Sequence, residues 1–290
     1  MTRAILAVLF SLSLVQVADA APKSSGGAKT SSAAKKPSGA VTWPATVALT
    51  AADGVGTKAR FGVPAKATRG VVLVHDARSS GLALDKLAES MLAEGWAVAV
   101  PDLRGHGASA FADGHALQMV DYQSGLGDVK AAIAGLRARG VKQVALVGVG
   151  FGATMALTAA SEDPGVVSTI AVSPGLSLQG MPLEGVVGRY GARPVMFVHA
   201  TGDRLATDAA TKLHAVATGL KDDYAVTADR GTLAELLRAE MGFASRLGAF
   251  LRATWDSPLP PPPPVVPRTA DVRVEEARAV GTAFGAEGSK

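Results

Sequence analysis

The chain has 290 residues, of which 48% are hydrophobic and 19% are charged, so it can bury a large core and is not globally disordered. Its formal net charge is +4, but four of its lysines lie in a Ser/Gly/Ala-rich stretch near the N-terminus. This charge does not indicate a nucleic-acid partner, because no basic helix or aromatic platform accompanies it. The sequence has no cysteine, which excludes disulfides, thiolate catalysis and cysteine metal sites.

The first twenty residues are typical of a cleaved signal peptide. Arg3 supplies a positive start, residues 4–17 form a short apolar run, and Ala18-Asp19-Ala20 places small residues where a signal peptidase cuts. We therefore predict a mature protein that begins at about Ala21 and is secreted or periplasmic. No later stretch of the sequence resembles a transmembrane segment.

Two segments outside the predicted domain lack apolar periodicity. Residues 21–43 are rich in Ser, Gly, Ala and Lys and are expected to form a flexible linker. Residues 256–290 begin with a proline run at 260–264, which favours polyproline II and predicts a disordered tail. The tail is either a stiff spacer or a docking segment for an envelope protein.

Residues 44–255 alternate short apolar strands with amphipathic helical stretches. An opening hairpin is predicted at 46–50 and 59–63, and further strands are predicted at 71–75, 96–100, 143–148, 166–173, 194–199 and 223–228. Helices are predicted at 83–94, 117–138, 151–161, 206–219 and 232–254, with Asp128 on an ordinary amphipathic surface. This alternation predicts an α/β fold with a mostly parallel twisted sheet, an antiparallel N-terminal hairpin and helices on both faces. Only about twenty residues separate Ser173 from Pro194, so no large cap domain is expected and any pocket should be shallow.

The most informative segment is VALVGVGFGATMAL, at 144–157. It places glycines at 148, 150 and 152 between a buried strand and a helix. A G-x-S-x-G nucleophile elbow has this spacing, with serine in the middle. A dinucleotide-binding loop is the alternative, but that motif normally follows the first strand and has an acidic residue about twenty positions later. Here Ser173, not an acid, ends the next strand.

At this point the chain resembles the α/β-hydrolase family, particularly its dienelactone-hydrolase-like and small esterase-like members. The segments that carry the resemblance are, in chain order, TVALTAADGVGTKARFGVPA (46–65), GVVLVHDARSS (70–80), VPDLRGHGAS (100–109), VGVGFG (147–152), FVHATGDRLATD (197–208) and DRGTLAELL (229–237). The resemblance implies that Asp203 holds the catalytic acid position. It puts Gly150 at the nucleophile position and Arg230 at the histidine position, although a shift of one residue would put Asp229 there instead.

These substitutions predict a degenerate triad. Glycine has no side chain that can attack an acyl carbon, and arginine stays protonated and cannot serve as a base. His75 begins the loop that the family uses for an oxyanion-hole amide, and Asp76 replaces the usual glycine there. The leading interpretation is an exported pseudo-hydrolase that binds a small ligand, with an anion among the candidates, or an envelope partner.

Two hypotheses describe how Arg230 acts in such a protein. It forms an ion pair with Asp203 across the former triad, or it joins the free N–H groups of Phe151 and Gly152 in an anion site. For the function as a whole, a weak carboxylic-ester hydrolase that uses a loop serine, and a purely structural module, remain alternatives. No metal site is expected, because His115, His199 and His214 lack ligand spacing, and no cofactor is expected.

Overall fold

The computed structural model describes residues 46–255. The predicted signal peptide (1–20), linker (21–43) and tail (256–290) lie outside the described residues. Within 46–255 no helix is long and apolar enough to cross a membrane.

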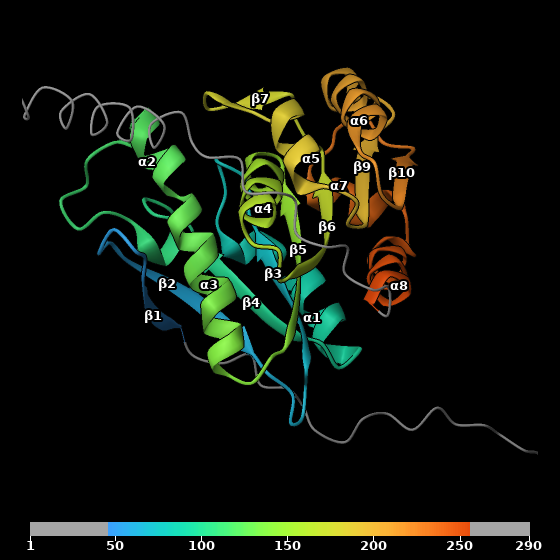
Figure 1. The fold of residues 1–290 in the computed structure, drawn as a ribbon. Coiled ribbons are helices and arrows are strands. Elements are labelled where there is room, and N and C mark those ends of the chain that lie inside the picture. Colours follow the sequence, from blue (N-terminus) through green and yellow to red (C-terminus); the bar gives the residue numbers. More distant parts are fainter. Residues whose placement is uncertain (1–45, 256–290) are drawn as a thin grey trace, which may run out of the picture. The chain divides into compact units, whose positions relative to one another are not determined.

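An eight-stranded sheet forms the centre of the structure (Figure 1). The strands lie in the order β1-β2-β4-β3-β5-β6-β9-β10. β2 pairs antiparallel with β1 and β4, and every other pairing is parallel. The α/β-hydrolase fold class predicted from the sequence is therefore confirmed. The strand bounds are β1 Val47–Thr50, β2 Gly56–Gly62, β3 Arg69–Val74, β4 Ala97–Asp102, β5 Gln143–Val149, β6 Val166–Val172, β9 Val195–Ala200 and β10 Lys221–Val226.

Helices cover both faces of this sheet and enclose two hydrophobic cores. Along β3, Val72 and Val74 point into one core and Val71 and Leu73 into the other, as expected of strands buried on both sides. Helices α3, α4, α5 and α6 cover the first core, and α1, α7 and α8 cover the second. The helix bounds are α1 Asp85–Ala93, α2 Met119–Ser124, α3 Leu126–Ala138, α4 Phe151–Glu162, α5 Glu184–Tyr190, α6 Arg204–Val216, α7 Leu233–Ala239 and α8 Phe243–Trp255, with short 3-10 turns η1 Gly81–Leu84 and η2 Gly107–Ser109.

The structure differs from the predicted elements in three places. The predicted helices at 117–138 and 232–254 are each two helices, which meet at Gly125 and around Gly242. The stretch 173–194, for which no helix or strand was predicted, contains a small hairpin, β7 Ser177–Leu178 and β8 Met181–Pro182, followed by α5. Gln179 and Gly180 both have positive φ and make the tight turn of this hairpin, which short-range periodicity does not reveal.

The strand order has its topological switch point between β3 and β5. The chain leaves β3 for β4 on one side of this pair and leaves β5 for β6 on the other. The loops that follow β3 and β5 therefore diverge, and in open parallel sheets ligands bind beyond the carboxyl ends of the strands at such a switch point. Residues 75–80 and the start of α4 are found there.

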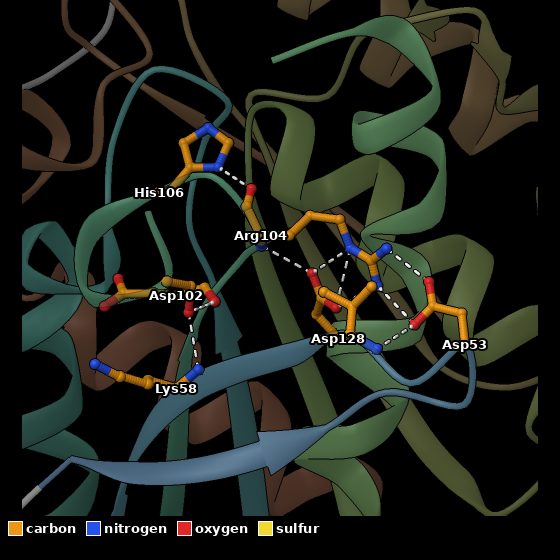
Figure 2. A network of polar contacts seen from close by, with 8 residues as sticks. Asp53, Lys58, Asp102, Arg104, His106 and Asp128 are labelled. Carbon is orange, nitrogen blue, oxygen red and sulfur yellow. Dashed lines mark hydrogen bonds and ion pairs between the residues drawn. The ribbon is translucent and has the colours of Figure 1, made fainter. Parts of the chain in front are cut away.

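A buried ion-pair network fixes the loop that follows β4 (Figure 2). The guanidinium of Arg104 lies 2.7 Å from Asp128 on α3 and 2.6 Å from Asp53 in the β1–β2 turn. The Arg104 backbone N–H also donates to Asp128, at 2.8 Å. Asp128 is completely buried, so the sequence-based expectation that it lies on an ordinary surface was wrong. The Arg104 side chain holds the pKa of the Asp53 carboxyl below its usual range.

We expect Asp128→Ala to lower the free energy of unfolding by about 3–5 kcal/mol, because it leaves the buried Arg104 guanidinium without its main partner. Chemical denaturation measures this change. The control is Glu162→Ala, which removes a pair with Lys130 on the solvent-exposed side of the same helix and should cost less than about 1 kcal/mol. Equal losses in the two variants would contradict a structural role for the network.

Candidate functional site

The turn between β5 and α4 has the backbone geometry of a nucleophile elbow. Gly150 has φ 56° and ψ −119°, a left-handed conformation that costs a residue with a Cβ about 1–3 kcal/mol. The outer glycines allow close packing: a Cβ at Gly148 would lie 2.1 Å from the Gly152 carbonyl oxygen, and one at Gly152 would lie 2.2 Å from that of Val74. The two outer glycines are therefore required by the close packing of the turn. Glycine at position 150 avoids the backbone strain that a residue with a Cβ would have there.

The Asp76 carboxylate occupies the space above this turn. Its Oδ1 accepts the N–H of Phe151, at 2.8 Å, and the N–H of Ala77, at 2.8 Å. In α/β hydrolases the amide that follows the nucleophile and an amide of the loop after β3 form the oxyanion hole. A Cβ at Gly150 would lie only 2.3 Å from the same Oδ1. Asp76 thus fills both the oxyanion position and the place of a nucleophile side chain.

This contact corrects the expectation of an empty anion site at the elbow. The Phe151 N–H, which we expected to be free, already donates to Asp76. Gly152 packs against the β3 backbone at Val74 and His75. The Phe151 amide that the sequence offered for an external anion is therefore bound by the chain's own carboxylate.

His75 holds the loop that carries Asp76. Its ring is fully buried, its Nε2 accepts the Leu103 N–H at 3.0 Å, and its Nδ1–H donates to the Asp76 carbonyl oxygen at 2.7 Å. Only the neutral ring can accept at Nε2, and burial lowers the pKa of His75 to about 4. His106 supports the same loop, with one ring nitrogen 2.6 Å from the Ala77 carbonyl oxygen and the other 2.9 Å from that of Arg104.

Asp203 lies at the carboxyl end of β9, where the resemblance places the catalytic acid. Its Oδ1 caps α6 by accepting the Ala206 N–H at 3.1 Å. A Cβ at Gly231 would lie 3.1 Å from its Oδ2 and 2.0 Å from the Ser173 hydroxyl. The position that faces Asp203 is therefore Gly231, and the Ser173 side chain fills the adjoining space by donating to the Gly231 carbonyl oxygen at 2.6 Å.

Arg230 lies elsewhere. Its side chain is exposed, its backbone N–H donates to Glu235 at 3.1 Å, and among residues 46–255 it forms no ion pair with Asp203. The expected Arg230–Asp203 bridge is thus absent from this part of the chain, and neither Arg230 nor Asp229 takes the place that faces the acid. The reason is the direction of the loop after β10, which turns Gly231 toward Ser173 and leaves Asp229 and Arg230 exposed.

The remaining candidates are not assembled into a second catalytic centre. His115 stacks on Phe111, and His199 contacts Thr207 and Asp223. Ser109 donates to the Asp102 carbonyl oxygen. Within residues 46–255 no three His, Asp or Glu side chains gather in a way that would hold a metal ion.

A separate open groove lies beyond the carboxyl ends of β9 and β10, with a volume of about 810 Å³. Arg230 lines it, whereas Asp76, Gly150 and Asp203 do not. Its lining residues are Thr201, Gly202, Thr227, Ala228, Asp229, Arg230, Glu235, Arg238 and Ala239.

Comparisons with known proteins agree with this fold. The serine aminopeptidase S33 family model matches residues 65–191, which include the Asp76 loop and the elbow but not Asp203 or Gly231. The esterase Pf2001 of Pyrococcus furiosus is similar over 73% of this chain and 93% of its own, at 17% identity and a TM-score of 0.64. A dienelactone hydrolase from Anabaena variabilis is similar over 76% of this chain and all of its own, at 18% identity and a TM-score of 0.59. No curated protein sequence matches the chain significantly.

We expect the stability of the protein to fall between pH 6.5 and 4 because of His75. The folded state keeps this ring neutral down to about pH 4, whereas the unfolded chain binds a proton below about pH 6.5, so falling pH favours unfolding by up to about 3 kcal/mol. Denaturation curves at several pH values measure the slope. His75→Gln should flatten it, whereas His115→Gln, at an exposed ring, should not; an unchanged slope in His75→Gln would contradict the assignment.

Proposed function

We propose that this chain, which has the α/β-hydrolase fold, is an exported protein that binds a ligand or partner without hydrolysing it. The observation that carries the proposal is the Asp76 carboxylate on the two amides of the oxyanion hole. A negatively charged oxygen there competes directly with the oxyanion that forms when an ester is attacked. Residue 150, at the position of the attacking group, is glycine, so it supplies no nucleophile.

Magnitudes support the absence of useful turnover. Loss of the nucleophile and base of a triad costs about six orders of magnitude in kcat. The residual acceleration of about 10³–10⁴ over water in such variants comes from the oxyanion hole and from binding. Here the chain's own carboxylate occupies that hole, so this residual source is also blocked.

A weak esterase that uses a loop serine is the second candidate. Ser173 and Asp203 both border Gly231, where a Cβ would contact the two side chains. Its hydroxyl donates to a carbonyl oxygen, and neither His75 nor His106 contacts it; both rings are bound to the loops after β3 and β4. The geometry therefore favours a structural role for Ser173, and the ester assay below separates the two candidates.

The first experiment measures hydrolysis of short-chain aryl esters by the protein from Ala21 onward. We expect no enzyme-like turnover in the wild type. The restoring variant is Asp76→Gly/Gly150→Ser/Ser173→Gly/Gly231→His, which clears the oxyanion hole and the space beside Asp203 before it supplies nucleophile and base. This variant should gain turnover of at least about 100-fold over background.

The matched control is Gly150→Ser/Gly231→His with Asp76 and Ser173 retained. It should stay inactive and be less stable, because the new side chains meet Asp76 and Ser173. Wild-type turnover at enzyme-like rates that Ser173→Ala abolishes would establish the esterase alternative instead. Circular dichroism of each variant verifies that it folds.

Export is tested by expressing the full chain in a Gram-negative bacterium. We expect the protein in the periplasm or medium with an N-terminus at Ala21, as determined by mass spectrometry of the intact chain. Ala18→Arg/Ala20→Arg should leave the first twenty residues attached, because a peptidase needs small side chains at these positions. Recovery of an uncleaved wild-type chain in the cytoplasm would overturn this part of the proposal.

A further inference from the structure

The open groove beside the former triad has a defined floor. Past the ends of β9 and β10, the Thr201 N–H donates to the Val226 carbonyl oxygen and the Gly202 N–H to that of Ala228, each at 2.9 Å. These bonds continue the parallel pairing of the two strands into their loops, and α7 contributes Arg238 and Ala239 to the lining. Its volume of about 810 Å³ lies within the range of small-molecule sites.

The charged groups of this groove are not neutralised by one another. Arg230, in the loop after β10, and Arg238, in the last turn of α7, both line it. Among residues 46–255 neither guanidinium has an acid within ion-pair distance, although Asp229 and Glu235 line the same groove. Glu235 instead accepts the backbone N–H of Arg230, which orders the loop and leaves the Arg230 side chain exposed.

We infer that this groove binds the anionic group of a ligand, a carboxylate or a phosphate, between Arg230 and Arg238. The planar guanidinium matches both anions through paired hydrogen bonds. The exposed side chains of Thr201 and Thr227 supply hydroxyl donors on the floor. The inference deepens the proposed function, on which it rests, by naming the ligand chemistry and by placing it outside the former catalytic crevice.

This assignment explains how an anion-binding role for Arg230 is compatible with a filled oxyanion hole. At the elbow an external anion would have to displace Asp76, a carboxylate already held by two amides. Among residues 46–255 no carboxylate pairs with either guanidinium of the groove, and Asp229, next to Arg230 in the sequence, lines the same groove. Asp229 is expected to weaken anion binding, so its removal should raise the affinity of the groove for anions.

The test is a titration of the folded protein from Ala21 onward with inorganic phosphate and, separately, acetate, at constant pH and ionic strength. Amide chemical shifts in ¹⁵N-labelled protein report the binding site. We expect saturable shifts at Thr201, Thr227 and Arg230 and none at Phe151 or Ala77. A response to phosphate alone identifies a phosphate ligand, and a response to both identifies a general anion site.

Four variants decide between specific binding and general surface charge. Arg230→Gln and Arg238→Gln should each weaken binding about tenfold, the effect of one lost charge-assisted contact. Asp229→Asn should tighten binding about twofold, because it removes a repelling charge. Arg189→Gln makes the same charge change on α5 and should leave the affinity unchanged.

Absence of saturable shifts at the groove, or equal weakening by Arg189→Gln and the groove variants, would overturn the inference. Failure of the proposed function is recognised separately, because ester turnover is assayed on the same samples. A protein that hydrolyses esters and binds no anion in the groove refutes both, whereas an inactive protein that binds no anion refutes only the groove.

Discussion

The Asp76 carboxylate on the amides of Phe151 and Ala77 is the interaction on which the interpretation of this molecule depends. It joins the loops after β3 and β5, at the point where the strand order of the sheet reverses. In an active hydrolase the two amides donate to an oxyanion that forms only in the transition state. Here both amides already donate to the Asp76 carboxylate, so neither is left to bind such an oxyanion.

A continuous set of buried contacts holds that carboxylate in place. Arg104 joins the β1–β2 turn to α3 through Asp53 and Asp128, and the loop that follows it reaches the Asp76 loop through His106 and His75. Buried charges of this kind contribute little net stability, but each is costly to leave unpaired. The network therefore acts mainly by making alternative positions of these loops unfavourable. A rigid loop that points a carboxylate at the elbow is consistent with a protein in which stability has replaced turnover.

Sequence patterns predicted the sheet and the tight turn of the elbow because each depends on local spacing, whereas only the family resemblance places Asp203 at the acid position. Buried parallel strands appear as apolar runs, and three alternate glycines mark the tight turn at Gly150. The contents of the site were not predictable in this way. Whether Asp76 turns toward the elbow, or which of residues 229–231 faces Asp203, depends on loop directions that a single backbone rotation changes. The burial of Asp128 was not predicted because it is a charged residue. It can be buried only because it pairs with Arg104, which lies far from it in the sequence. The replacement of the family's glycine by Asp76 was the one visible signal of a filled oxyanion hole.

The residues that fill the site form two pairs, Asp76 with Gly150 and Ser173 with Gly231. In each pair, the side chain of the first residue occupies the space that a side chain at the glycine would need. Asp76 can hold its position only because residue 150 has no Cβ, which would lie 2.3 Å from the carboxylate. Ser173 can bond to the Gly231 carbonyl oxygen only because residue 231 has none, which would lie 2.0 Å from the hydroxyl. In each pair, replacing the glycine alone by a larger residue creates a clash with its neighbour. Replacing the neighbour alone removes the clash but supplies no catalytic side chain. The two pairs act at opposite sides of the former triad, so an active site requires both to change together.

Substitutions coupled in this way are strongly non-additive. The proposed inactive arrangement is therefore separated from an active one by several individually unfavourable steps, whereas Arg230, outside both pairs, lines the neighbouring groove.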